Sequence, residues 1–417
     1  MPISSEPIPE GAIAIDRGNI AAIGDRSSIL EEYPSAEIED FGEAAILPGL
    51  VNCHSHLEVT AMRGALDDVE HDFRSWLLKL NGLRAAMTEA EIIEAARNGA
   101  IEGAQAGITC FGDIGRFGMA GVEALKSVGL RGVLFQETEF SPDDRSAVDD
   151  FYALRQKFEA LRRSANDLVE IGLSPHSPYT VSARLFRLIA DFARREGVKV
   201  TIHAAESDEE DALMRNGTGF FTEVYRKFGV EWKSPCVSSI SYLASTGILA
   251  ANPLLVHCVS VTDADIKIIA DNRASIAHCP KSNAKFGHGC APLEAFLNAG
   301  IAVGLGSDSV ASNNVCDLLE ESRFAALAAR NRRGRNGFIS AREALEMATL
   351  GGAKALGLDH LIGTLETGKN ADIAIISLAH QAQRPVNEIH AAIVFSSNAR
   401  DVIATIVNGK TIYSRNP

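Results

Sequence analysis

The chain has 417 residues, of which 46% are hydrophobic and 23% are charged, and its formal net charge is −14. This length and composition predict a globular α/β protein with one large domain and a small accessory one. So acidic a surface repels phosphate backbones and argues against nucleic acid as a partner. The densest basic stretch, residues 330–335, is interpreted as a solvated turn between two helices.

The cysteines and the N-terminus bear on the cellular compartment. Seven Cys, an odd number without a C-x-x-C pair, predict reduced thiols rather than a disulfide framework. Residues 1–18 lack the charged and apolar segments of a signal peptide, and no apolar run approaches the ~20 residues that span a bilayer. We therefore expect a soluble, cytoplasmic protein without membrane contact.

Short β segments are predicted at both ends of the chain. Residues 11–24 alternate like a hairpin that bends at 16–19, and residues 371–378 and 401–414 form short strands, the latter with an Asn408-Gly409 turn. Because chain ends often lie close together, we expect residues 1–46 and 370–417 to form one small β domain.

Between these ends, short apolar runs alternate with segments of helical periodicity such as 90–106 and 183–197. The apolar runs are 45–56, 107–114, 131–139, 169–176, 198–206, 253–260, 274–280 and 301–309. Alternating β and α units predict a parallel sheet, and eight units predict its closure into a (β/α)8 barrel over residues 47–369.

Ionisable side chains stand at the ends of these runs. They are His54, His56, Asp113, Glu137, Glu139, His176, His203, His257, His278 and Asp308. In a (β/α)8 barrel the carboxyl ends of all strands share one face, where the active site lies. The sequence therefore predicts a polar site at that face.

A metal site is predicted within this set. His54 and His56 alternate on one strand, so both imidazoles point the same way. With His203 and the carboxylate of Asp308 they make a nitrogen-rich site suited to one Zn²⁺, with Fe²⁺ or Mn²⁺ as alternatives. Such a site can hold a water whose pKa falls to about 7. The fourth run ends in His176 rather than a lysine, so a second metal held by a bridging carboxylated lysine is not expected.

Three residues are candidates for proton transfer. Glu206 lies three positions beyond His203 and can shuttle protons, although a solvent-facing carboxylate in the acidic run 206–211 is an alternative. His257 can bond the attacking water or polarise the substrate, and its alternative is a core histidine. Asp308 can accept the proton of the water, and its alternative is a helix N-cap.

Substrate contacts are predicted from the loops. His176, Arg63, Trp76, and Ser282 and Asn283 in the loop after the seventh run are the candidate binding residues. Trp76 is equally well explained as a core residue. A cation such as Arg63 or Arg74 can pair with a substrate carboxylate.

The motifs together resemble the amidohydrolase superfamily, in its cytosine deaminase-like branch. They are P-G-L-V-N-C-H-S-H at 48–56, H-A-A-E at 203–206, V-H-C at 256–258, A-H-C-P-K-S-N-A-K-F-G-H-G-C-A-P at 277–292 and G-L-G-S-D-S-V-A-S-N-N at 304–314. The resemblance implies a barrel flanked by a β-sandwich built from both chain ends. It also implies His54, His56, His203 and Asp308 as metal ligands, with Glu206 and His257 as catalytic groups.

The same resemblance implies a hydrolytic deaminase of a small molecule, an aminopurine nucleoside. The loop 58–81 resembles the aminodeoxyfutalosine deaminases, which implies 6-aminodeoxyfutalosine as substrate and a place in menaquinone biosynthesis. S-adenosylhomocysteine, methylthioadenosine or adenosine deamination and triazine hydrolysis are alternatives on the same barrel. A non-catalytic scaffold is disfavoured because every proposed ligand is present. The resemblance further suggests a homodimer or larger assembly.

Overall fold

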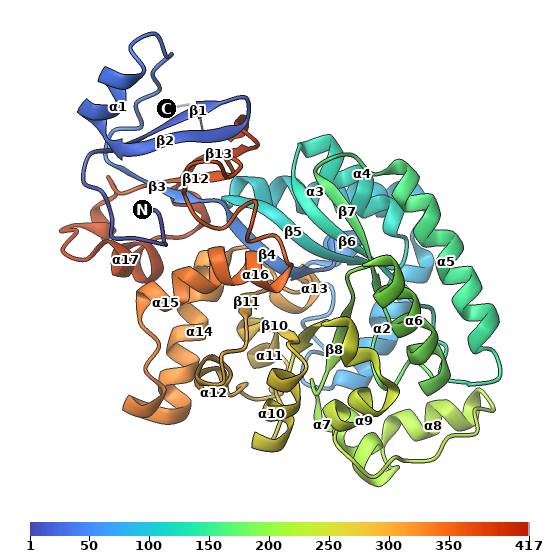
Figure 1. The fold of residues 1–417 in the computed structure, drawn as a ribbon. Coiled ribbons are helices and arrows are strands. Elements are labelled where there is room, and N and C mark those ends of the chain that lie inside the picture. The colour runs from blue at the N-terminus through green and yellow to red at the C-terminus, as the bar shows by residue number, and fades with distance from the viewer. Residues whose placement is uncertain (416–417) are drawn as a thin grey trace.

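Eight parallel strands form the centre of the computed structural model, which describes residues 1–415 (Figure 1). The first four are β4 (Leu50–Ser55), β5 (Ile108–Gly115), β6 (Arg131–Glu137) and β7 (Val169–Ser174). The other four are β8 (Thr201–Ala204), β9 (Leu254–His257), β10 (Ser275–His278) and β11 (Val303–Leu305). Parallel bridges from Leu173 to Val200 and from Ser55 to Asp308 join the two halves at both seams. The predicted (β/α)8 barrel is confirmed, and each of the eight apolar runs overlaps one of its strands.

Helices follow the barrel strands and cover the outside of the barrel (Figure 1). The longer ones are α2 (Phe73–Ala86), α3 (Glu89–Gln105), α4 (Gly118–Val128), α5 (Ala147–Ser164), α6 (Ala183–Glu196), α8 (Phe220–Lys227), α9 (Ser239–Thr246), α10 (Asp263–Asp271) and α14 (Leu318–Arg333). The shorter ones are α1 (Arg26–Glu32), α7 (Asp208–Asp211), α11 (Pro280–Lys285), α12 (Leu293–Asn298), α13 (Val310–Asn313), α15 (Ala341–Glu346), α16 (Gly352–Ala355) and α17 (Ile389–Ala391).

Helix α6 illustrates why these segments are helical. The Ser182 side chain caps its first turn, and Gly197 ends it in the left-handed conformation. Its buried residues recur with the helical period and face the barrel: Leu185, Phe186, Ile189, Ala190, Phe192 and Ala193.

Both chain ends build a smaller β unit beside the barrel (Figure 1). β1 (Gly11–Asp16) and β2 (Asn19–Asp25) form the predicted hairpin, and β3 (Ala44–Pro48), β12 (Ile373–Ser377), β13 (Val402–Val407) and β14 (Lys410–Ser414) form an antiparallel sheet in the order β14-β13-β12-β3. The strands therefore make two sheets rather than one. Ile20 on the hairpin packs with Ile373, Ile375 and Ile406 on the larger sheet, because each sheet buries one apolar face.

The run 45–56 divides between the two units. Its first half is β3 of the small sheet and its second half is β4 of the barrel, joined at Gly49. The division of the chain into domains at residues 46 and 370 remains a prediction.

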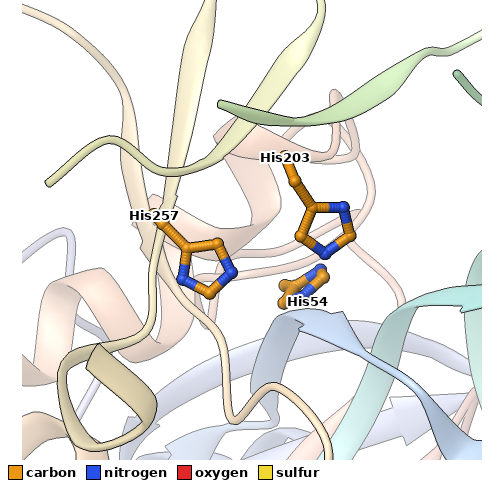
Figure 2. Close-up of side chains that lie close together, drawn as sticks. All are labelled: His54, His203 and His257. Carbon is orange, nitrogen blue, oxygen red and sulfur yellow. The ribbon is translucent and has the colours of Figure 1, made fainter. Parts of the chain in front are cut away.

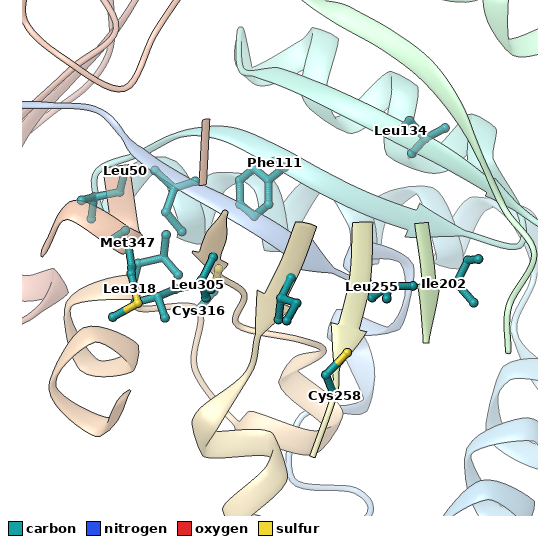
Figure 3. Close-up of a cluster of buried hydrophobic side chains, with 14 of the residues drawn as sticks. Leu50, Phe111, Leu134, Ile202, Leu255, Cys258, Leu305, Cys316, Leu318 and Met347 are labelled. Carbon is teal, nitrogen blue, oxygen red and sulfur yellow. The ribbon is translucent and has the colours of Figure 1, made fainter. Parts of the chain in front are cut away.

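Alternation along the strands creates two apolar layers. Leu50, Phe111, Leu134 and Leu255 point outward against the helices (Figure 3). Val51, Cys110, Val133 and Val256, one position away, fill the barrel interior. The barrel is therefore a packed scaffold whose polar side chains gather at the strand ends. No helix within residues 1–415 has the length and apolar character needed to cross a membrane.

Candidate active site

Three histidines from different strands meet at one end of the barrel. His54 lies on β4, His203 on β8 and His257 at the end of β9, and Figure 2 shows their rings close together. One ring nitrogen of each lies within 4.8 Å of those of the other two. Because the strands are parallel, their carboxyl ends bring these side chains to a single face, as predicted.

A second, overlapping group adds the remaining predicted ligands. Nε2 of His54 lies 3.3 Å from Oδ1 of Asp308, and Nε2 of His56 lies 3.7 Å from the same oxygen. Nε2 of His56 is also 3.4 Å from Nε2 of His203. The structure thus brings the four predicted metal ligands together, with His257 beside them.

This donor set fits a divalent metal ion. Both ring nitrogens of His54 are buried and make no hydrogen bond to any residue in 1–415, since the contact with Asp308 lacks hydrogen-bond geometry. Burial lowers the pKa of His54 to about 4 and holds that of His203 well below its ordinary value. Neutral imidazoles keep a lone pair for a metal, and three imidazoles with one carboxylate are ligands that zinc and related ions prefer.

Neighbouring groups orient two of these ligands. The hydroxyls of Ser282 and Ser312 donate to Oδ2 of Asp308 at 2.6 and 2.8 Å, which leaves Oδ1 facing the imidazoles. Nδ1–H of His203 donates to the carbonyl oxygen of His176 at 3.2 Å, which leaves Nε2 unprotonated, with a lone pair for a metal. Burial alone would raise the pKa of Asp308, but contact with the histidines outweighs it and holds that pKa well below its ordinary value.

Glu206 lies on the loop that leaves β8, and a second carboxylate fixes that loop. Glu210 accepts hydrogen bonds from the backbone N–H groups of Ala205 at 2.8 Å and of Glu206 at 3.0 Å. The Glu206 side chain is buried rather than solvent-facing, and its Oε1 lies 3.5 Å from Nε2 of His257. Burial raises the pKa of Glu206 to about 7, although His257 opposes the shift. A carboxyl group with this pKa exchanges protons near neutral pH.

His257 is oriented by Asn283. Nδ1 of His257 is 2.8 Å from Oδ1 of Asn283, so Nδ1–H donates to the amide oxygen and Nε2 is left facing Glu206. A histidine with one nitrogen held by an amide and the other facing a carboxyl group belongs to a polar site rather than to the apolar core.

Four non-glycine residues with positive φ lie at the same strand ends. Ala205, His257, Cys258 and Asp308 have φ values of +52°, +70°, +48° and +55°, a region that side chains with a Cβ rarely occupy. Such conformations persist where the surrounding structure enforces them, and they cluster at functional sites.

A charged wall borders the site on the side of β6 and β7. Nε2 of His176 lies 3.9 Å from Glu137, and Arg116 and Arg84 approach the same carboxylate at 3.5 and 4.0 Å. Glu58, buried behind them, contacts Arg84 and accepts the backbone N–H of Arg116 at 3.1 Å. The sequence reasoning identified His176 but missed Arg84 and Glu58. The position of Glu58, two residues after His56, was the available signal.

The other predicted substrate residues are engaged with the protein. Trp76 is 7% exposed and packs edge to face on Phe286, with ring centres 4.8 Å apart. The guanidinium of Arg63 contacts Glu102 and the carbonyl of Asn314 rather than the histidine cluster. Arg74 stacks over Phe220 and lies 3.5 Å from Glu223. A substrate role for Arg63, Trp76, Ser282 and Asn283 remains a prediction.

The sequence matches the model of the Amidohydrolase family over residues 45–412. The chain therefore belongs to this family and is a hydrolase. It is 32% identical over 410 residues to a 5-methylthioadenosine/S-adenosylhomocysteine deaminase of Pelotomaculum thermopropionicum, an alignment that covers 97% of this chain and 89% of the relative.

Solved structures with the same fold include several hydrolases. An adenosine deaminase from Xanthomonas campestris with bound zinc superposes with a TM-score of 0.85, at 26% identity, over 99% of this chain and 90% of its own. The zinc complex of the atrazine chlorohydrolase TrzN from Arthrobacter aurescens has a TM-score of 0.82 at 25% identity, over 96% and 89%. The aminofutalosine deaminase of Helicobacter pylori reaches a TM-score of 0.82 over 98% of this chain and 96% of its own, and at 23% identity this likeness is evidence for the fold alone.

Proposed function

We propose that the protein is a zinc-dependent hydrolytic deaminase of an adenosine-like nucleoside. The observation that carries the proposal is Glu206, a buried carboxyl group of pKa about 7 that lies beside the cluster of histidines. Deamination of an aminopurine needs such a group, because the ring nitrogen next to the reacting carbon must gain a proton. The named activity of the Pelotomaculum relative supports the same class of substrate.

The metal ligands would be His54, His56, His203 and Asp308. Zinc bound there would supply a water molecule of lowered pKa as the nucleophile. Asp308 keeps an ionised carboxylate beside the imidazoles and would accept a proton from the attacking water. Ser282 and Ser312 hold the carboxylate in place while it does so.

Two further residues would act on the substrate. Glu206 delivers a proton to the ring nitrogen adjacent to the amino-bearing carbon. His257, whose Nδ1–H is held by Asn283, keeps the unprotonated Nε2 directed into the site, where it accepts a hydrogen bond from the hydroxyl group that forms on that carbon. The expelled group is ammonia, formed when the amine takes up the proton relayed from water.

The substrate is best determined by ammonia release from zinc-loaded protein. The panel holds 5-methylthioadenosine, S-adenosylhomocysteine, adenosine, 6-aminodeoxyfutalosine, guanine, cytosine and an aminotriazine. We expect the adenosine-like nucleosides to be turned over, and preference among the first four identifies the 5′ group. The resemblance of loop 58–81 is what keeps 6-aminodeoxyfutalosine in the panel. Turnover of the triazine alone, by protein that holds zinc, would reject the deaminase and favour a triazine hydrolase.

A further inference from the structure

His288 stands next to Glu206 and takes no part in the chemistry described above. Its Nε2 lies 4.0 Å from Oε1 of Glu206, the same oxygen that His257 approaches at 3.5 Å. At 4.0 Å the two groups are too far apart for a hydrogen bond. Glu206 is thus flanked by two imidazoles, one oriented by Asn283 and one whose Nε2 remains unused.

That nitrogen is buried without a partner. The His288 side chain is 6% exposed, and its Nε2 makes no hydrogen bond with any residue in 1–415. Buried polar atoms in native proteins are nearly always satisfied, because an unpaired one has lost its hydrogen bonds to water. A partner from outside the chain is therefore expected in the working enzyme.

The ring is held in this position from behind. It packs edge to face on Phe73, with centres 4.9 Å apart, and lies 5.1 Å from Phe286. Its two chain neighbours, Gly287 and Gly289, have φ values of +70° and +108°, which only glycine adopts readily. The two glycines permit this path of the loop, and the two aromatic rings hold the imidazole in place.

We propose that His288 is a further substrate-binding residue, whose Nε2–H donates a hydrogen bond to a second ring nitrogen of the purine that Glu206 protonates. Burial lowers the pKa of His288 to about 4, so the ring is neutral and can donate from Nε2 without adding charge. A purine offers N3 and N7 as acceptors beyond the nitrogen that Glu206 serves. The inference rests on the proposed function, since it assumes a purine at Glu206.

The test compares His288→Phe and His288→Gln with the wild type. Phenylalanine keeps the packing on Phe73 and Phe286 but cannot donate, whereas glutamine retains a donor. We expect kcat/KM on the best nucleoside to fall about 10- to 100-fold in His288→Phe and to recover partly in His288→Gln. His360→Phe, which alters an exposed histidine, is the matched control and leaves kcat/KM unchanged.

Deaza analogues separate a hydrogen bond from a packing effect. The 3-deaza and 7-deaza counterparts of the best substrate are measured as competitive inhibitors of all variants. One of them is expected to bind the wild type about 10- to 100-fold more weakly than the parent nucleoside, yet to bind His288→Phe as well as the parent does. The proposal would be overturned if an analogue lost the same affinity for both proteins, or if neither analogue bound the wild type more weakly than the parent nucleoside. If His288→Phe does not fold, the affinities of the two analogues for the wild type decide. If wild-type protein releases no ammonia from any purine nucleoside, the proposed function fails and this inference fails with it.

Discussion

Asp308 uses its two carboxylate oxygens for different partners. Oδ2 accepts from Ser282 and Ser312, whereas Oδ1 faces His54 and His56. Ser282 is predicted to contact the substrate, and its hydrogen bond to Asp308 adds a role in orienting that carboxylate. Groups that orient a metal ligand in this way commonly change metal affinity 10- to 100-fold when removed.

We therefore expect Ser282→Ala to weaken zinc binding about 10- to 100-fold, because Oδ1 of Asp308 loses its fixed direction. The dissociation constant is measured by competition with a chelator of known affinity. Ser245→Ala, which removes an exposed hydroxyl bonded to the Tyr242 carbonyl, is the control. Unchanged zinc affinity in Ser282→Ala would contradict the orienting role of Ser282 and leave only its predicted contact with the substrate.

Glu206 is the residue on which the proposed chemistry depends. Glutamine has the same shape, but its amide cannot donate and take up a proton as a carboxyl group does. Glu206→Gln should therefore retain zinc, and its kcat should fall about 10²- to 10⁴-fold. Metal content is read by elemental analysis and kcat by ammonia release. Asp208→Asn, in the same acidic run but exposed, should keep wild-type turnover. Wild-type turnover in Glu206→Gln would remove the proton-transfer role.

At the scale of elements, the connection between β3 and β4 is the point where the small sheet meets the barrel. Gly49 lies there, directly against Thr109 of β5, and a Cβ on residue 49 would be 2.1 Å from the Thr109 hydroxyl oxygen. Thr109 is fully buried, so its short side chain has nowhere to move. The close approach of the two strands requires a residue without a Cβ.

Gly49→Ala should therefore lower the free energy of unfolding by about 1–3 kcal/mol, as overpacking does in a dense interior. The measurement is denaturant unfolding of both variants under one condition. Gly82→Ala on α2 is the matched control, because no atom lies within 4 Å of its added Cβ, and it should be neutral or stabilising by up to about 1 kcal/mol. Equal stability of the two variants would contradict the close contact at residue 49.

At the scale of the whole molecule, the predicted metal ligands span both seams of the barrel. β7 and β8 are joined by the single bridge from Leu173 to Val200, and β4 and β11 by that from Ser55 to Asp308. His203 on β8 lies next to the first seam, while His54 and Asp308 form the second. A bound metal would therefore tie together the two halves of the barrel.

Zinc removal should accordingly destabilise the protein as a whole. At free zinc 100 times its dissociation constant, binding adds about 2.7 kcal/mol to the free energy of unfolding. Thermal unfolding with zinc and with a chelator measures the difference, and hydrogen exchange should quicken most at the two seams of the apo protein. The His54→Ala variant should show little response to zinc. A wild type that unfolds at the same temperature in both conditions would argue against a metal at this site.

The barrel and the composition of its polar face can be predicted from the sequence alone. Strand residues alternate between two sides, and parallel strands end at one face, so the spacing of His54 and His56 and the position of Asp308 placed them together without any structure. The hairpin turns at 16–19 and at Asn408-Gly409 can also be predicted, because they follow from local backbone preferences.

The contacts between side chains across the site, in contrast, depend on how distant elements pack together. Glu210 behind Glu206, Ser312 on Asp308 and the unpartnered nitrogen of His288 depend on loops whose conformation arises from closure of the barrel. The pairing of the terminal strands into two sheets leaves no local pattern, because it joins distant segments, and only the family resemblance implied a β-sandwich there. Periodicity fixes which way a side chain points within its own element, whereas the partner it meets is set by the packing of other elements against it.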